Sequence, residues 1–177
     1  AGKSTLMNVL CGLYRPSSGE IWLEGKPVRF SSAKDAIAAG IGMVHQHFML
    51  IPTLTVVENC LIGIRDHHPV RLDTDRASKE LLALVSEYSM EIDPRAKVST
   101  LSVGEMQRVE IIKALFRGAN LLILDEPTAV LTPQETEQLF HMIRNLTARG
   151  LTVLFISHKL HEVKAISSRV TVLRRGK

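Results

Sequence analysis

The chain has few cysteines, few aromatic residues and no long apolar runs. Only Cys11 and Cys60 occur among its 177 residues, and neither belongs to a CxxC or Cys/His zinc pattern. This spacing excludes a disulfide framework and those zinc sites, so we expect two free, buried thiols in a reducing cytoplasm. No segment approaches the roughly 18 to 20 apolar residues that a membrane-spanning helix requires.

The sequence also lacks a concentrated block of basic charge. It carries 22 basic and 18 acidic residues, for a net charge of +4, and its basic residues are scattered. Because a nucleic-acid groove needs clustered Lys and Arg, we predict a mildly basic solvated surface and no nucleic-acid partner. The composition is 45% hydrophobic and 23% charged, which is typical of a globular domain that buries a core.

Strand and helix patterns alternate over most of the chain, which predicts an α/β fold with a mostly parallel sheet. Strands are expected at 41–44, 120–124, 151–156 and 170–173, and an antiparallel hairpin at 20–23 and 27–30. Helices are expected at 3–13, 31–40, 55–62, 133–148 and 159–166.

The segment 74–119 has helical periodicity and no strand pattern, which indicates a helical subdomain inserted into the α/β core. The predicted organisation is therefore a first core part at 1–73, the helical subdomain at 74–119 and a second core part at 120–177.

The opening residues Gly2, Lys3, Ser4 and Thr5 precede an apolar helix and match the second half of G-x-x-x-x-G-K-[ST]. In such a loop the backbone amides bind phosphate, the lysine reaches the terminal phosphates and the serine ligates Mg²⁺. The first glycine and its strand are missing, so we expect a fragment cut at both ends. A capped helix start is the alternative.

The run LLILDEP predicts a buried strand that delivers Asp125 and Glu126 at its carboxyl end, where ligands bind in open α/β sheets. Asp125 is a candidate magnesium ligand, and Glu126 is a candidate base for an attacking water. Two acidic residues in an ordinary strand-end turn are the alternative. His158 follows the next apolar strand, so we expect it at the same edge, where it could contact a γ-phosphate.

Ser102, Gly104 and Glu105 lie at the start of the predicted helix that runs to Phe116, in LSVGEMQRVEI. A helix N-terminus can bind an anion, and a glycine there lets a phosphate approach the backbone. Ser102 and Glu105 also have the spacing of a capping box, which is the alternative. The pairs His45/His47 and His67/His68 have no further ligand at metal-binding spacing, so we predict no metal site on them.

In this order, the motifs resemble the ATP-binding cassette (ABC) ATPases over essentially the whole chain. GKST resembles the end of the Walker A loop, Gln46 the Q-loop glutamine, LSVGEMQRVEI the signature motif, LLILDEP Walker B, and His158 the switch histidine. The resemblance implies a P-loop NTPase core, ATP and Mg²⁺ as cofactors, and catalytic roles for Glu126, His158 and Gln46. It also implies metal contacts from Ser4, Gln46 and Asp125.

VHQHFMLIPTLTVVEN and EPTAVLTPQE resemble importers of simple sugars and nucleosides, whose ATPase subunit carries two fused cassettes. This resemblance implies membrane permease subunits, a second cassette, an extracytoplasmic solute-binding protein acting indirectly, and a peripheral location at the cytoplasmic face of the membrane. The sequence departs from the family at Val103, which replaces a glycine, and at Thr132, where many cassettes have an aspartate.

Two other interpretations stay open at this point. One is an ABC ATPase that acts on DNA or ribosomes, although the coiled-coil heptads and charged linkers of those proteins are absent. The other is an inactive fragment with weak ATP affinity, because each lost phosphate–amide bond is worth about 1.5 to 3 kcal/mol.

Overall fold

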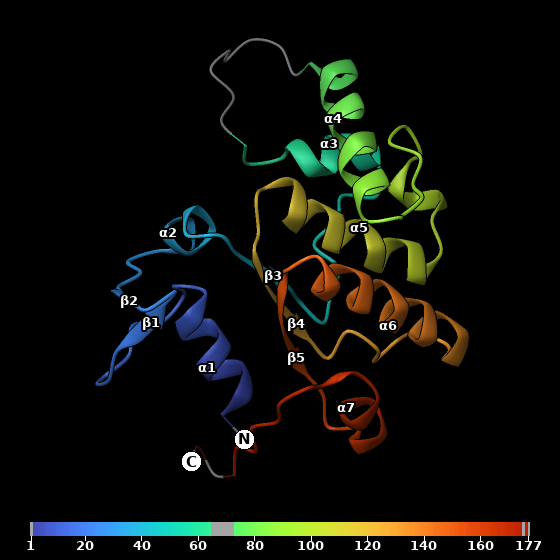
Figure 1. Cartoon of the computed structure of the whole chain (residues 1–177). Helices are drawn as coiled ribbons and strands as arrows, with labels where there is room; N and C mark the ends of the chain where they lie inside the picture. Colours follow the sequence, from blue (N-terminus) through green and yellow to red (C-terminus); the bar gives the residue numbers. More distant parts are fainter. Residues whose placement is uncertain (1, 65–72, 175, 177) are drawn as a thin grey trace.

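A computed structural model describes residues 2–64, 73–174 and 176, so His67 and His68 lie outside the described residues. At its centre is a parallel sheet in the order β3-β4-β5 (Figure 1). The strands are β3 (Ile41–Val44), β4 (Leu121–Asp125) and β5 (Thr152–Ile156). The three parallel strands predicted from apolar runs are therefore confirmed, and their carboxyl ends meet at one edge.

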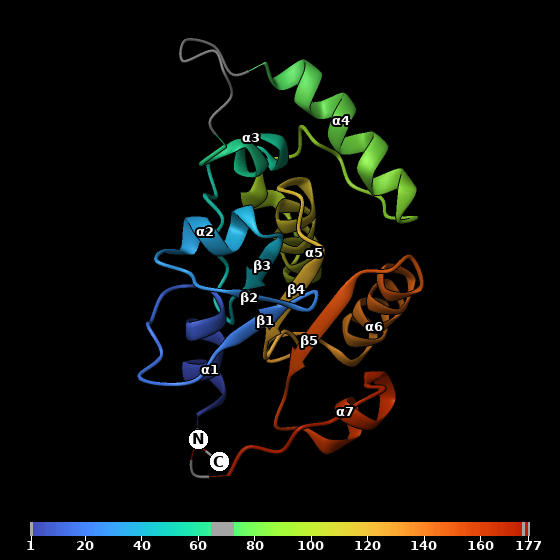
Figure 2. The same ribbon diagram turned by 60° about the vertical axis from the view of Figure 1, so that its left-hand side comes forward.

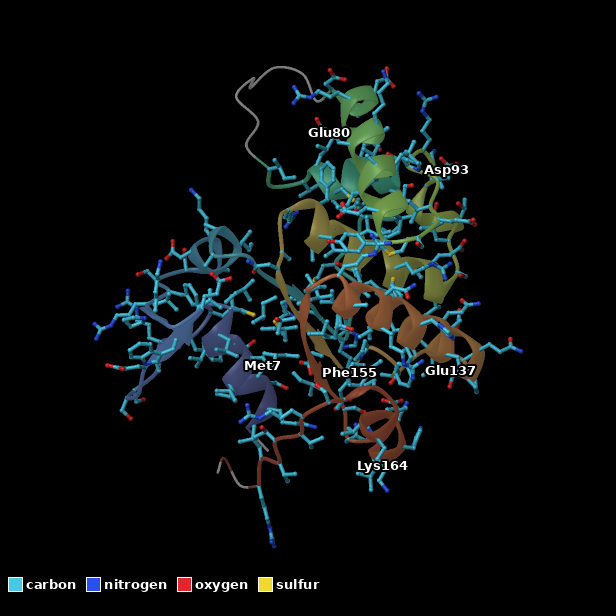
Figure 3. The ribbon with its side chains drawn as sticks, viewed as in Figure 1. Met7, Glu80, Asp93, Glu137, Phe155 and Lys164 are labelled. Atoms are coloured by element: carbon cyan, nitrogen blue, oxygen red, sulfur yellow. The ribbon has the colours of Figure 1, made fainter. Side chains whose placement is uncertain are left out.

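The two faces of this sheet are covered by different helices because side chains alternate along each strand. Leu122 and Leu124 join the larger core cluster, which includes residues of α5 (Val103–Phe116) and α6 (Pro133–Ala148). On the same face Phe155, which is labelled in Figure 3, meets Phe140 of α6 edge-on, with ring centroids 5.9 Å apart. Ile123 and Ile156 belong to the smaller cluster on the opposite face.

The smaller cluster is completed by two short helices on the side of the sheet away from α5 and α6 (Figure 2). They are α1 (Lys3–Leu10) and α2 (Ala33–Ala38), and a two-stranded hairpin of β1 (Ile21–Leu23) and β2 (Lys26–Val28) lies beside them. The hairpin is tighter than predicted, because Leu23 pairs directly with Lys26 across a two-residue turn in which both residues have positive φ.

A layer of helices packs around the larger core cluster. It consists of α3 (Val56–Leu61), α4 (Thr74–Glu87), the short 3₁₀ helix η1 (Val98–Thr100) and α5. Helix α3 packs on both α4 and α5, although it precedes the predicted subdomain boundary at residue 74. All three α-helices share one apolar cluster with the sheet, so the division at 73/74 and 119/120 remains a proposal.

One predicted strand is absent from the described residues, and the predicted end of the first helix lies too late in the chain. Residues 170–173 form no strand, because Val170 and Val172 are exposed, at 58% and 81%, and no described strand pairs with them. The first helix ends at Leu10 rather than Leu13, because Gly12 adopts a left-handed conformation with φ of 71°. The last helix, α7 (Leu160–Ile166), packs against α6.

The two cysteines are free and buried, as predicted. Burial raises the pKa of the Cys11 thiol to about 11 and that of Cys60 to about 12, so both are protonated at neutral pH. Within the described ranges, none of the helices combines the length and the apolar character that crossing a bilayer demands.

Candidate functional site

The carboxyl edge of the sheet brings together Ser4 and Asp125, the residues predicted to hold a metal. Alternation along β4 places Asp125 on the same face as Ile123, which is the face covered by α1. Helix α1 begins at this edge, and its Ser4 side chain lies close enough to Asp125 to oppose the rise in the pKa of that carboxyl. Two oxygen-bearing side chains that lie 121 positions apart in the sequence thus meet at one point.

The charge balance at this edge does not favour the Asp125 anion. Burial and the neighbouring Glu126 carboxylate raise the pKa of Asp125 above its ordinary value. The positive charges of His45 and Lys3 and the hydrogen bond from Ser4 only partly oppose this shift. A cation placed beside Asp125 would therefore stabilise the charged form of this carboxyl.

The start of α1 has the backbone geometry of a phosphate-binding helix. Gly2 has a left-handed conformation with φ of 106°, and no side chain caps the first turn. Ser4 and Thr5 are exposed there. The Lys3 ammonium lies 3.4 Å from the carbonyl oxygen of Ser157, the residue before His158. The uncapped amides and the lysine are therefore oriented toward the same edge as Asp125.

Glu126 and His158 also meet at this edge. The His158 Nδ1 atom lies 3.1 Å from Glu126 Oε1, and the side chains are 65% and 27% exposed. Glu126 has φ of 48°, a left-handed conformation that is unfavourable for a glutamate, while its amide still bonds to the carbonyl of Ile156. This strained backbone turns the Glu126 side chain out of the strand alternation and toward His158.

Gln46 lies at the third strand end of the edge, two residues beyond β3, and is exposed. The segment after it is fixed to the helical layer. Buried Asn59 bonds to both the amide and the carbonyl of Ile51, and the amide of Met49 donates to buried Glu110. Residues 49–51 are therefore held against α3 and α5.

The signature segment has a different construction. Ser102 and Glu105 form the capping box that the sequence allowed: Ser102 Oγ accepts from the amide of Glu105, and Glu105 Oε2 accepts from the amide of Ser102 at 2.7 Å. These backbone and side-chain bonds lower the pKa of Glu105. The first turn of α5 is thus stabilised within the chain itself.

Gly104 is buried against a residue that the sequence interpretation missed. Its amide donates to Glu135 Oε1 at 3.1 Å, and a Cβ added at Gly104 would lie 2.7 Å from that oxygen. Glu135 is also the third residue of the α6 capping box, where it accepts from Thr132. The sequence signal was T-x-x-E at Thr132, which marks a helix start but not its contact with α5.

The two regions lie on different faces of the sheet. Helix α5 packs with α6 on one face, whereas α1 lies on the opposite face (Figures 1 and 2). Among the described residues, no hydrogen bond or ion pair joins the start of α5 to the residues of the edge.

The edge suits Mg²⁺ carried by a nucleotide better than an all-protein metal cage. Among the residues that the structure describes, no three His, Cys, Asp or Glu side chains are grouped to hold a metal. The paired oxygens of Ser4 and Asp125 fit the usual arrangement, in which Mg²⁺ takes one or two protein oxygens and completes its shell with phosphate and water.

Comparison with known proteins identifies relatives over the whole chain. A family model described as "ABC transporter" matches residues 1–129. The chain is 49% identical over its full length to the nucleoside import ATP-binding protein NupA of Lactococcus lactis, of which it covers 35%. It is 50% identical over its full length to the guanosine import ATP-binding protein NupO of Bacillus subtilis, again covering 35%. It therefore spans about a third of the length of these curated relatives.

Solved structures give the same architecture. A nucleotide-free ATP-binding cassette from an ABC transporter matches with a TM-score of 0.77 and 25% identity, covering 93% of this chain and 69% of that one. A cassette in its ADP conformation matches with a TM-score of 0.77 and 26% identity, with the same coverage. The predicted α/β class, with its parallel sheet and antiparallel hairpin, is thereby confirmed.

Proposed function

This chain belongs to the ABC transporter family, and from that premise we propose that it binds Mg-ATP and hydrolyses it to power the import of a small solute. The observation that carries the proposal is the cluster of Ser4, Asp125, Glu126 and His158 at one sheet edge, beside the uncapped start of α1. Its relatives include nucleoside and ribose import proteins, so a nucleoside or simple sugar is the proposed class of solute.

Each residue at the edge has a distinct proposed task. The amides from Gly2 to Thr5 and the Lys3 ammonium bind the phosphates, while Ser4, Asp125 and Gln46 hold the magnesium shell. The bound Mg²⁺ would neutralise the charge that develops on the transferred phosphoryl group. Glu126 accepts a proton from the attacking water, and His158 holds Glu126 on one side while it faces the terminal phosphate on the other.

The second set of residues completes the site from a neighbouring cassette. The start of α5 bonds its own Glu105 and Glu135 and has no bond to the edge residues among the described contacts, so we propose a head-to-tail pair in which Ser102, Gly104 and Glu105 contact the phosphate held by the partner. ATP then favours the closed pair, and hydrolysis removes the charge that held it. The second cassette is proposed to be fused to this one, as the greater length of the relatives suggests.

The remaining partners are inferred from the import proteins. The proposed location is the cytoplasmic face of the membrane, where the segment after Gln46 would contact permease subunits that receive solute from an extracytoplasmic binding protein. Support within the chain is the anchoring of that segment to α3 and α5 through Asn59 and Glu110, which gives a mechanical route from the nucleotide edge to the helical layer.

Calorimetry of Mg-ATP binding tests this proposal. We expect saturable binding that Lys3→Ala weakens roughly ten- to hundredfold, because a hydrogen bond to a charged group contributes about 1.5 to 3 kcal/mol. Lys26→Ala, in the exposed part of the hairpin, is the matched control and should bind as the unaltered chain does. Binding that is absent from the unaltered chain, or equal in Lys3→Ala, would contradict a phosphate site at the start of α1.

A further inference from the structure

A buried carboxylate lies behind the sheet edge. Glu162, in the first turn of α7, is 1% exposed, and it is among the largest fully buried side chains of the described residues. A charged group is costly to bury unless it is paired and hydrogen-bonded, so its partners indicate what the fold uses it for. No sequence motif pointed to this residue.

Both oxygens of Glu162 are occupied by groups from two different loops. Oε1 accepts from Thr128 Oγ1 at 2.7 Å, and Oε2 accepts from Ser157 Oγ at 2.7 Å. The ammonium of Lys159 lies 3.0 Å from Oε1. Burial raises the pKa of Glu162, but these hydrogen bonds and the lysine outweigh it and hold the pKa below its ordinary value. Glu162 is therefore ionised at neutral pH.

The two hydroxyls sit next to the reacting groups in the sequence. Thr128 follows Glu126 by two residues, and Ser157 directly precedes His158. One carboxylate thus joins the loop that carries the proposed base to the loop that carries its histidine partner. Lys159 closes the network, because its Nζ also reaches the carbonyl oxygen of Thr128 at 3.3 Å and its amide donates to Ser157 Oγ at 3.0 Å.

The groups held this way need support from elsewhere. Glu126 has an unfavourable left-handed backbone, which the surrounding structure has to hold, and the His158 side chain is 65% exposed, so little packing fixes it. Their 3.1 Å contact depends on where the two loops lie relative to one another. A displacement of about 1 Å between reacting groups can cost about a hundredfold in rate.

We propose that Glu162 is a positioning residue that sets the relative placement of Glu126 and His158 by bonding Thr128 and Ser157 at once. This inference rests on the proposed ATPase function, since it assigns Glu162 to the same site. Because Glu162 is buried and both its oxygens bond these hydroxyls, its proposed role is exercised through the two loops.

The kinetic test uses Glu162→Ala and Glu162→Gln in the assembled ATPase. We expect Glu162→Ala to lower kcat about a hundredfold while the KM for ATP changes less than about twofold, because the phosphate-binding residues stay in place. Glu162→Gln keeps the shape of the side chain. Its carbonyl oxygen can accept from one hydroxyl and its NH₂ group can donate to the other, so this variant should retain more kcat than Glu162→Ala. Wild-type kcat in Glu162→Ala overturns the proposal, as does a rise in KM with kcat unchanged.

A control separates positioning from general loss of stability. Met142→Ala truncates a buried side chain of α6 that takes no part in this network. It should lower the free energy of unfolding but leave kcat unchanged under conditions where the protein is folded. If Met142→Ala lowers kcat as much as Glu162→Ala does, the role of Glu162 is merely structural.

Hydrogen exchange of the chain without nucleotide gives a readout independent of activity. Glu162→Ala should speed exchange of the amides at 126–131 and 157–159, and Met142→Ala should not do so selectively. This pattern with no hydrolysis in the unaltered protein would refute the proposed function and keep the positioning role. Unchanged exchange at both loops would refute the positioning role even if the ATPase is active.

If Glu162→Ala does not fold, the two hydroxyls supply the test. Thr128→Val and Ser157→Ala should each lower kcat, and each should have a smaller effect when combined with the other than alone, because losing either hydroxyl already breaks the link through one carboxylate. Independent, additive effects would overturn the proposal.

Discussion

The sheet edge and the start of α5 both contain carboxylates near a helix N-terminus, but the two regions treat them in opposite ways. At the edge, burial and the neighbouring Glu126 raise the pKa of Asp125. At the start of α5, hydrogen bonds from the Ser102 backbone and side chain lower the pKa of Glu105, and the equivalent bonds from Thr132 lower that of Glu135. The sheet edge therefore destabilises the charged form of Asp125, whereas the start of α5 stabilises the charged forms of Glu105 and Glu135.

The start of α5 is complete without a ligand, whereas the sheet edge is not. The α5 start already satisfies its amides with the chain's own Glu105 and Glu135, so it is well formed without a ligand. The edge has a helix start without a side-chain cap and an aspartate whose charged form is destabilised. Binding of Mg²⁺ and a phosphate would remove both of these unfavourable contributions to the free energy of folding. Contact with an anion at the α5 start requires competition with Glu135 for the Gly104 amide.

The largest effect is expected for Glu126→Gln, which tests whether the edge performs chemistry as well as binding. ATP hydrolysis should fall roughly 10²- to 10⁴-fold because water loses its base, whereas Mg-ATP binding should stay within about threefold. The measurements are single-turnover hydrolysis and calorimetry. Glu137→Gln, an exposed glutamate on α6, is the control and should hydrolyse ATP normally (Figure 3). Near-normal turnover in Glu126→Gln would remove Glu126 from the role.

A smaller effect is expected for Ser102→Arg, which tests whether the α5 start acts across a cassette pair. The bulky cation should weaken ATP-driven association by roughly tenfold or more, a change of about 1.4 kcal/mol, while ATP still binds at the edge. Sedimentation with and without ATP measures this. Ser102→Ala is the matched control, since it removes the same cap, at a cost of about 1 kcal/mol in helix stability, without adding bulk. Association that survives in Ser102→Arg would contradict the shared site.

The smallest effects are expected on the stability of the protein without nucleotide, measured for one carboxyl of each region. Asp125 has a raised pKa, so its ionisation opposes folding as pH rises through that value, and Asp125→Asn should raise the denaturation midpoint at pH 7. Glu105 has a lowered pKa, so its stabilising contribution is present above about pH 4.3 and is lost as pH falls through the folded-state pKa. Glu105→Gln should therefore lower the midpoint at pH 7.

Both differences should shrink toward pH 3, where the unaltered carboxylates take up protons. Urea titrations at pH 7 and pH 3 provide the measurement. Glu91→Gln, at an exposed position outside the helices, is the control and should leave the midpoint unchanged. If Asp125→Asn and Glu105→Gln shift the denaturation midpoint in the same direction, the two regions do not have opposite effects on their carboxylates.

Most of the fold followed from local patterns that physical chemistry ties to one outcome. The apolar runs ending at Val44, Asp125 and Ile156 specify buried parallel strands, and Ser32, Thr132 and Ser102 mark helix starts because their side chains cap exposed amides. The strand predicted at 170–173 failed because β-branched residues favour extended backbone only where a neighbouring strand pairs with them.

For the candidate site, the sequence by itself determined the residue types and the strand ends that carry them. It could not place Glu135 against Gly104, or Glu162 between Thr128 and Ser157, because contacts across 31 and 34 positions depend on how α5, α6 and α7 pack. The motifs already implied that Ser4 and Asp125 share one site, whereas the tertiary structure alone decided the contacts of Glu135 and Glu162. Periodicity and capping act over a few neighbouring residues, whereas the meeting of distant loops is fixed by the packing of whole helices on a shared sheet.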